Sequence, residues 1–238
     1  MHFQTSYENF HSKAERIYRP TYQYTSKNGF KTHFARIPHD YINELPNEFP
    51  EINQLIRFQN QERKYIRIDK GKFRPEHVYL TDKEIFDVFS LPLLSGNSDN
   101  ALAEPFSIVI TASLAQQYFG TKDVLGEDIF VVGDWNAEET RYKITGVLKD
   151  IPSNTHIPID MLMSFKNDSE RSGWAYTYIL LNEGTNIEDV NNKMPEFIQK
   201  YSDKDSTREI AYEFQQLPNI HLHSDLAREI IPNGNFFT

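Results

Sequence analysis

The alternation of hydrophobic and polar positions is clearest in the middle of the chain. Residues 106–110 form a short apolar run with Phe106, Ile108 and Ile110, which is typical of a β-strand. In residues 112–119 the apolar side chains recur at helical spacing, Thr111 stands at the position of an N-cap, and Gly120 follows as a C-terminal stop. The pattern therefore predicts a strand, a helix and a turn in direct succession.

The two ends of the chain show a similar order of elements. The first end begins with a predicted helix over 5–18, in which Glu8 occupies a capping-box position. The last third contains a predicted helix over 187–201 with Asn186 as its N-cap. The other elements expected at the ends are strands over 18–25, 30–37, 52–58, 157–165, 176–181 and 210–217, and a short helix over 39–47. Two β-α-β-type units at the ends indicate one α+β unit formed from both chain ends.

The middle of the chain has the pattern of an inserted, mainly-β section. Strands are expected over 65–68, 73–79, 106–110, 128–132 and 142–147, and helices over 82–89 and 111–119. The polar segments 95–104 and 133–140 are typical of an exposed loop and a hairpin tip. We therefore predict an α+β protein in which residues 1–58 and 152–238 form one discontinuous subdomain and residues 59–151 form the inserted one.

Several motifs occur in an order that resembles one protein family. The central strand is followed by AQQYFG, VLG and TGVLKDIPSNTH, with FPEI and LTDKEIFDVFSLPLLSG before it and WAYTYILLNEGTN after them. This order resembles the periplasmic core domain of MacB/FtsX-type ABC transporter permeases, and the resemblance covers nearly the whole chain. The segments 27–31 and 198–208 depart from the pattern, as surface loops are expected to do.

The resemblance implies a non-catalytic domain on the periplasmic side of the bacterial inner membrane, carried between two membrane helices. The subdomain built from both ends would be the membrane-proximal, porter-like one, and the inserted subdomain would be sabre-like. ATP would be bound by a separate ATPase subunit or domain, so no cofactor is expected in this chain. The implied partners are that ABC ATPase, reached through the membrane region, a second permease domain in a dimer, and a periplasmic adaptor or hydrolase.

The resemblance also points to individual positions in two regions. Coupling to the membrane helices is expected at the end segments, through Tyr7, Phe10, Tyr18, His221 and His223. Partner contact is expected on the loops of the inserted subdomain, at Asn97, Asp99, Trp135 and Asn136. The polar neighbours of Trp135 indicate that its ring is exposed, as contact residues of this type are.

Composition excludes several classes of protein. A chain of 238 residues with 39% hydrophobic and 13% aromatic content can bury a substantial core. The net charge of −9, with basic residues interleaved among acids, argues against nucleic acid as a partner. No apolar run approaches the roughly 18 residues that cross a bilayer, so we expect the chain as given to be soluble. The absence of cysteine removes disulfides and thiolate chemistry.

The sequence gives little support for a catalytic or metal-binding site. On a strand, His221 and His223 would share one face and could hold a metal from that edge, but the spacing implies no third ligand. Glu188 and Asp189 are explained by their place at a helix N-terminus. The sequence contains no GxxxxGK[ST], GxSxG or SxxK motif. We therefore predict no catalytic, cofactor-binding or metal-binding residues.

Three functions remain open from the sequence. The first is a domain that converts ATP-driven motion in the cytoplasm into movement outside the membrane, for efflux, extraction or signalling. The second is an FtsX-like scaffold or sensor that activates a cell-wall hydrolase or a signalling partner. The third is a free-standing periplasmic binding protein or enzyme, which apolar helices immediately flanking the chain would exclude.

Overall fold

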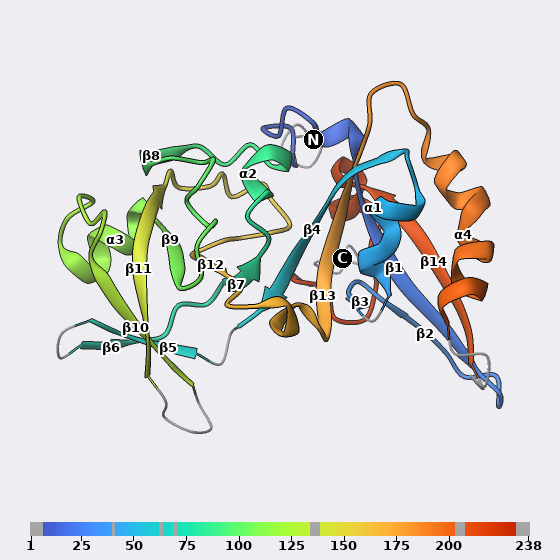
Figure 1. The fold of residues 1–238 in the computed structure, drawn as a ribbon, viewed down its shortest axis with the longest axis horizontal. Helices are drawn as coiled ribbons and strands as arrows, with labels where there is room; N and C mark the ends of the chain where they lie inside the picture. Colours follow the sequence, from blue (N-terminus) through green and yellow to red (C-terminus); the bar gives the residue numbers. More distant parts are fainter. Residues whose placement is uncertain are drawn as a thin grey trace, which may run out of the picture. The chain divides into compact units, whose positions relative to one another are not determined.

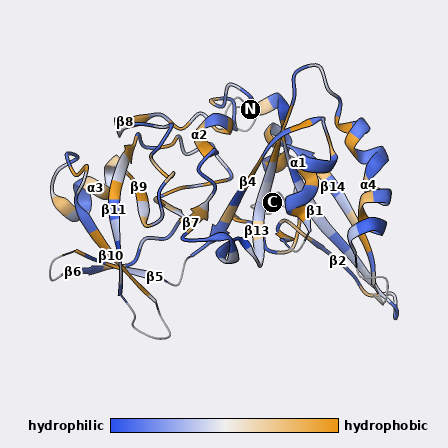
Figure 2. Cartoon of the chain, viewed as in Figure 1, coloured by the Kyte–Doolittle hydropathy of each residue, from blue (hydrophilic) through white to orange (hydrophobic). Residues whose placement is uncertain are grey.

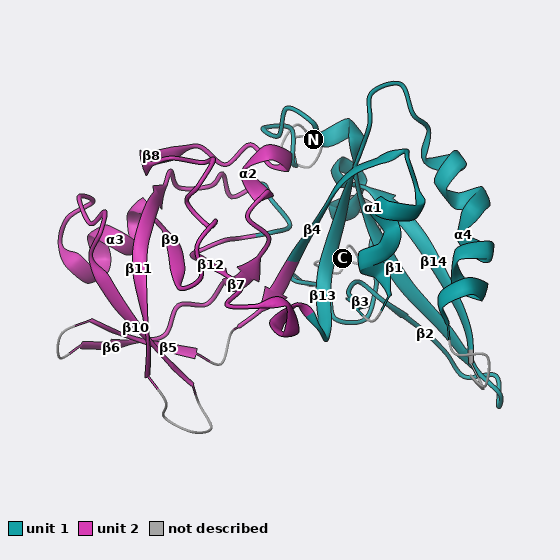
Figure 3. Ribbon diagram, viewed as in Figure 1, with its two compact units in different colours: residues 1–57, 154–157, 172–238 teal, residues 58–153, 158–171 magenta. Residues whose placement is uncertain are grey.

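The computed structural model of the chain describes residues 7–39, 41–61, 64–68, 71–133, 139–202 and 208–231, without the side chains of Arg208, Leu222 and His223. The chain divides into two compact units (Figure 3). Unit 1 takes its residues from 1–57, 154–157 and 172–238, and unit 2 takes its residues from 58–153 and 158–171.

Unit 1 is a sheet built from both ends of the chain, with one long helix (Figure 1). Its strands are β1 Ile17–Ser26, β2 Lys31–Phe34, β3 Ile37–Pro38, β4 Ile52–Asn60, which continues into unit 2, β13 Trp174–Leu181 and β14 Arg208–Gln216. Its helices are η2 Ala14–Arg16, η3 Ile42–Glu44, α1 Leu45–Glu48, α4 Ile187–Tyr201, η5 Leu217–Asn219 and α5 Ile220–His223. The strands lie in the order β14, β1, β13, β4, with β2 beside β1 and β3 beside β13. β1 runs antiparallel to β2, β13 and β14.

Helix α4 supplies much of the hydrophobic core of unit 1. Its buried residues Val190, Met194 and Phe197 pack in one cluster with Tyr22 of β1 and Ile179 of β13. The helix carries hydrophilic and hydrophobic residues along its whole length (Figure 2), as a helix with one buried face does. The predicted helix over 187–201 is confirmed, and the predicted N-cap, Asn186, accepts a hydrogen bond from the backbone N–H of Glu188 at 3.2 Å.

Unit 2 is a mixed sheet with two short helices and a 3-10 turn. Its elements are β5 Lys64–Ile68, β6 Gly71–Phe73, β7 Val78–Thr81, α2 Ile85–Val88, β8 Leu93–Gly96, β9 Ser107–Thr111, α3 Ala112–Phe119, β10 Asp128–Gly133, β11 Glu139–Leu148, β12 Met161–Ser164 and η4 Asp168–Arg171. The order is β4, β7, β12, β9, β11, β10, β5, β6, with β8 beside β11. β12 is parallel to β7 and β9 is parallel to β11, whereas the pairs of β10 with β11 and with β5 are antiparallel.

The strand, helix and turn predicted around residue 110 are confirmed as β9 and α3. Thr111 Oγ1 accepts a hydrogen bond from the backbone N–H of Leu114 at 3.3 Å, so the predicted N-cap forms. Gly120 closes the helix in the left-handed region with a φ of 73°, which residues with a Cβ adopt only with strain. Local signals alone therefore define both ends of α3.

We expect the substitution Thr111→Ala to lower the free energy of unfolding by about 1 kcal/mol, because the cap of α3 is lost. Urea denaturation followed by circular dichroism measures the change. Ser113→Ala is the matched control, because Ser113 is exposed and alanine favours helices. An equal loss of unfolding free energy in both variants would contradict the assignment of Thr111 as the N-cap.

One predicted helix is wrong, one predicted strand is confirmed over part of its length but with other partners, and one segment that was considered as a strand is helical. The helix over 5–18 is replaced, in its described part, by a turn at residues 7–10, the short η2 and the start of β1. The strand over 157–165 is shorter, and as β12 it pairs with β7 and β9 in unit 2, not with the end segments. The IHLH segment forms α5 where a strand was considered, so the face-sharing argument for His221 and His223 fails.

The predicted exposed loop over 95–104 is partly buried. Ala101 and Leu102 are 1% and 3% exposed, because the loop packs back on unit 2 and the carbonyl of Ala101 accepts a hydrogen bond from Thr145 Oγ1 at 2.5 Å. The predicted hairpin around 133–140 is confirmed by the pairing of Val132 with Glu139, and its tip lies outside the described residues.

The α+β class is confirmed, since both units combine mixed or antiparallel strands with few helices. No helix in the described ranges is long and apolar enough to cross a membrane.

Candidate functional site

A chain of buried polar side chains in unit 1 joins the two end segments of the protein. We call this set the buried polar network, and its members are Glu8, His11, Arg19, His156, Tyr178, Gln215, Ser224 and Glu229. They come from the segment before η2, from residues 154–157, from strands β1, β13 and β14, and from the segment after α5. Glu8 and Arg19 are both 0% exposed, so neither charge has access to water.

Glu8 accepts hydrogen bonds from several donors at once. Its Oε1 accepts the backbone N–H of His156 at 2.6 Å and lies 2.7 Å from the Nδ1 of the same residue. Its Oε2 lies 3.2 Å from Thr155 Oγ1 and 3.3 Å from His11 Nε2. Burial by itself raises the pKa of Glu8, but the hydrogen bonds that Glu8 accepts from His11 and from the ring and backbone of His156 outweigh burial and hold the pKa well below its usual range. Glu8 is therefore a buried, ionised carboxylate.

His156 connects this carboxylate to the central sheet. Burial lowers the pKa of His156 and outweighs the opposing effect of Glu8, so the ring is neutral at pH 7. We assign its proton to Nδ1, which donates to Glu8, because Nε2 then accepts from the hydroxyl of Tyr178 at 2.8 Å.

Arg19 holds the other end of the network. Its guanidinium donates to both carboxylate oxygens of Glu229 at 2.8 Å and to the Oε1 of Gln215 at 2.6 Å from Nη2 and 3.2 Å from Nε. Nη2 also donates to Ser224 Oγ at 2.9 Å. Burial lowers the pKa of Arg19, but the charges and hydrogen bonds of Tyr178 and Glu229 outweigh it and raise the pKa above its ordinary value. The bidentate pair with Glu229 ties the C-terminal segment to β1.

Two backbone outliers flank the network, one in each end segment. Glu8 has a φ of 62° and Arg228 a φ of 65°, in the left-handed region that costs a residue with a Cβ about 1 kcal/mol. The carbonyl of Arg228 accepts a hydrogen bond from the hydroxyl of Tyr176 at 2.7 Å. Such strain persists only where the surrounding contacts impose it, and it gathers at functional sites. Both end segments are therefore held in place by the contacts of unit 1.

The structure brings some of the predicted coupling residues together. Tyr7 and His221 stack on each other, with ring centroids 3.4 Å apart and planes 3° apart, so the two end segments are in direct contact. The ring of Phe10 lies 4.0 Å from that of His11, a member of the network. Tyr18 instead lies in β1 opposite Gln216 and packs against the core beside α4. The side chain of His223 lies outside the described part of the chain.

The predicted partner-contact residues are only partly described. Asn97 and Asp99 lie in the turn after β8 in unit 2, both exposed, and Asn97 Oδ1 accepts the backbone N–H of Asp99 at 3.0 Å. Asn97 therefore stabilises its own turn. Trp135 and Asn136 lie outside the described residues.

Sequence reasoning missed Arg19, His156, Tyr178 and Glu229, and interpreted Glu8 as a capping residue only. The one available signal was Arg19 in a strand that also holds Tyr18, Tyr22 and Tyr24, since an arginine that is buried in a sheet needs a partner. Nothing in the sequence identifies that partner as a residue 210 positions away.

Comparisons with known proteins identify one family. The family described as "MacB-like periplasmic core domain" matches residues 2–197 of the chain. No curated protein matches the sequence significantly.

Three solved structures are similar to this chain in fold. A domain described as part of a permease protein from Porphyromonas gingivalis has a TM-score of 0.74 at 20% identity, over 87% of this chain and 91% of that one. The periplasmic region of MacB from Actinobacillus actinomycetemcomitans has a TM-score of 0.52 at 16% identity, over 80% of this chain and 87% of that one. The extracellular domain of the noncanonic ABC-type transporter YknZ from Gram-positive bacteria has a TM-score of 0.53 at 14% identity, over 80% of this chain and 99% of that one.

Proposed function

Because the chain belongs to the MacB-like periplasmic core domain family and is thereby an extracytoplasmic domain of the ABC transporter permease class, we propose that its function is mechanical. In this proposal the domain converts ATP-driven motion of the membrane helices into movement outside the membrane. Family membership argues against the free-standing binding protein or enzyme. Efflux, extraction and activation of a hydrolase would all use the same coupling.

The observation that carries the proposal is the buried polar network. One hydrogen-bonded chain runs from Glu8 in the first segment through His156 and Tyr178 to Arg19 and Glu229 in the last. Moving either end segment away from the sheet would leave a buried charge without its partner, which costs several kcal/mol. The end segments and the sheet of unit 1 therefore move as one body, and a displacement of the membrane helices becomes a displacement of the whole unit.

The proposal assigns no chemical step to this chain. ATP is bound by a separate ATPase subunit or domain, because the sequence has no phosphate-binding loop. Within the described residues no group of three or more His, Asp or Glu side chains is placed to hold a metal. The partners in this proposal are the ABC ATPase, a second permease domain, and a periplasmic adaptor or hydrolase.

A cysteine pair at positions 7 and 221 tests the coupling in the full-length permease assembled with its ATPase. The 238-residue chain has no cysteine, so Tyr7→Cys with His221→Cys introduces the one cysteine pair of this domain, where two stacked rings now lie. We expect a disulfide to form readily and to leave ATP hydrolysis intact, because the end segments already move together. In a second variant, Glu8→Cys with Tyr178→Cys, we expect little disulfide to form between the two cysteines. This variant should still lower ATP-dependent activity, because both substitutions remove side chains of the buried polar network.

A matched pair across the β1–β2 hairpin, Thr25→Cys with Lys31→Cys, serves as the control, since these residues face each other in one ladder of the same unit. It should cross-link in all nucleotide states without an effect on activity. A 7–221 disulfide that abolishes ATP-dependent activity would show that the end segments must separate during the cycle, and the proposal of a single rigid body would be wrong.

A further inference from the structure

The sheet of unit 2 has an outer face that is rich in basic residues, although the chain as a whole is acidic. We call this the basic face, and it consists of the outward side chains of β11, β10, β5 and β6 and of Arg74 directly after β6; its cations are Arg67, Lys72, Arg74, Arg141 and Lys143. The opposite side of the same strands carries Ile66, Ile129 and Ile144, which lie in the hydrophobic core. The basic face is therefore the solvent side of a half-buried sheet.

The strand register places two cations directly opposite each other and a third in the same row. Arg141 is paired with Phe130, Phe130 with Arg67, and Arg67 with Lys72, so one row across four strands holds three cations and an aromatic ring. Like charges opposite each other on paired strands destabilise a sheet. Arg67 is held within the protein by Glu139 and Phe130, but Arg141 and Lys72 at the two ends of this row are exposed, which points to a role in binding.

Neighbouring carboxylates neutralise only part of this positive charge. Glu139 forms a bidentate pair with Arg67, at 2.8 and 2.7 Å, and Asp128 lies 3.6 Å from Arg141 and 3.7 Å from Lys143. Among the described residues of the face the cations outnumber these carboxylates, in a chain whose net charge is −9. Arg141 and Lys143 are 70% and 63% exposed, so both can contact a partner while keeping a loose contact with Asp128.

Aromatic rings lie between the cations. The guanidinium of Arg67 lies 4.2 Å from the ring centroid of Phe130, and the ammonium of Lys72 lies 4.3 Å from that of Tyr65, which Arg74 also approaches at 5.1 Å. These cation–π contacts fix long side chains that would otherwise be mobile. At Arg67, Lys72 and Arg74 a partner therefore meets charges that are already ordered, which lowers the entropy loss on binding.

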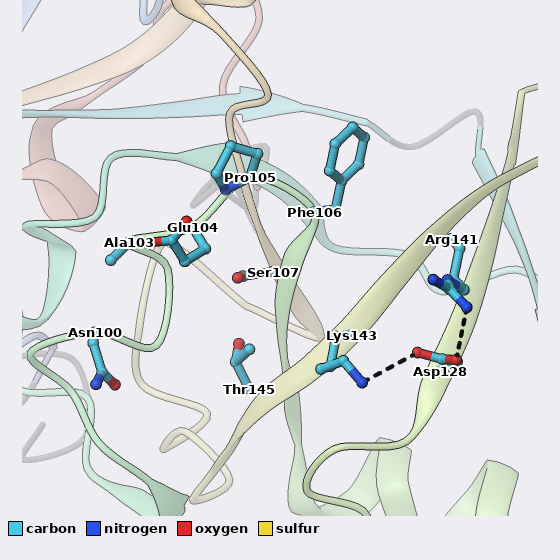
Figure 4. Close-up of a pocket in the computed structure, with 10 residues that line it drawn as sticks. All are labelled: Asn100, Ala103, Glu104, Pro105, Phe106, Ser107, Asp128, Arg141, Lys143 and Thr145. Carbon is cyan, nitrogen blue, oxygen red and sulfur yellow. Dashed lines mark ion pairs between the residues drawn. The ribbon is translucent and has the colours of Figure 1, made fainter.

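The face ends at an open cavity beside β11. The cavity has a volume of about 550 Å³, and Figure 4 shows Arg141, Lys143 and Asp128 on one side of it and Phe106 on another. Phe106 is 42% exposed and has a φ of 62°, an unfavourable backbone conformation for a phenylalanine. An apolar side chain of a partner would find an aromatic wall here, next to the cations.

We propose that the basic face and this cavity dock an acidic segment of a partner protein that carries an aromatic or large apolar side chain. This rests on the proposed function, because it gives the chemistry of the extracytoplasmic partner. Carboxylates of the segment pair with the row of cations, and its apolar side chain lies against Phe106. Asp128 and Glu139 stand among the cations, so a polyanion charged at every position meets two repulsive contacts, whereas a segment that alternates carboxylates with uncharged side chains can place an uncharged one opposite each of them.

The test uses the 238-residue chain and a synthetic ten-residue peptide of alternating glutamate and tyrosine as the probe, measured by fluorescence anisotropy at low salt. We expect the peptide to bind, a lysine–tyrosine peptide of equal length not to bind, and affinity to fall as salt screens the charges. Lys72→Gln combined with Arg141→Gln should weaken binding about tenfold, because two exposed charge contacts are removed.

Lys83→Gln combined with Lys122→Gln is the matched control, since it removes the same charge from unit 2 away from β5, β6, β10 and β11. It should leave the affinity unchanged. Three results would each overturn the proposal. The acidic peptide does not bind, the control variant loses as much affinity for it as the Lys72 and Arg141 variant does, or inorganic polyphosphate binds more tightly than the peptide. The measurement involves neither membrane nor ATPase, so its failure leaves the cysteine-pair experiment unaffected.

Discussion

Replacing Glu8 with alanine is expected to lower the free energy of unfolding by about 3 kcal/mol. The substitution leaves the backbone N–H and the ring N–H of His156 without their acceptor, in a place that water does not reach. The left-handed backbone at position 8 remains as unfavourable for alanine as for glutamate, so no strain is relieved. Urea denaturation of the 238-residue chain at pH 7 gives the difference.

Glu15→Ala is the control for this prediction, because Glu15 lies in the same segment with an exposed side chain. Its effect should stay within about 0.5 kcal/mol. Glu8→Gln keeps the shape of the side chain and removes the charge, so it should fall between the two and provides a measurement if the alanine variant does not fold. Equal stability of wild type and Glu8→Ala would mean that the first segment is not held by the network.

How well the sequence predicted an element depended on where its determinants lie. The strand, helix and turn around α3 were predictable because Thr111 and Gly120 act on residues three or four positions away. The same holds for α4 with its cap at Asn186. The α+β class followed from these elements, since it depends on element type and not on pairing.

Glu8 shows why the first segment was predicted wrongly. Its spacing from Thr5 suits a capping box, a local interaction of about 1 kcal/mol. In the structure its carboxylate is bound by residues about 150 positions later, and those charged hydrogen bonds together outweigh the local preference. A helix cannot pass through a residue with a φ of 62°, so the predicted helix is replaced by a turn.

Pairing between strands was the other property that the pattern did not contain. The alternation over 157–165 correctly indicated a strand, but a period of two identifies a buried face and not the neighbour that covers it. β12 joins β7 and β9 in unit 2. For the same reason the basic face was not predicted from the sequence, because Arg67, Lys72 and Arg141 come into one row only through the register of four strands.

Stability should fall as the pH is lowered from 7 to 5, and His39 should account for about 2 kcal/mol of that fall. His39 is 3% exposed in unit 1, between Asn43 and Thr177, with its ring nitrogens 3.1 Å from Asn43 Oδ1 and 2.6 Å from Thr177 Oγ1. Burial lowers the pKa of His39 to about 3, and the nearby Arg57 acts in the same direction, against the hydrogen bond that the ring donates to Asn43 Oδ1. The side chain is therefore neutral in the folded protein at any pH above about 3.

The sign of the effect follows from where the proton binds. In the unfolded chain the imidazole takes up a proton near pH 6.5, whereas in the folded chain it stays neutral, so lowering the pH from 7 to 5 favours the unfolded state. Urea denaturation at half-unit steps of pH measures the slope. His39→Gln keeps a polar side chain that cannot titrate and should flatten the slope, whereas the control His77→Gln, at a partly exposed position in unit 2, should leave it unchanged. If His39→Gln retained the full slope, other groups, such as the buried His156, would have to carry the acid sensitivity.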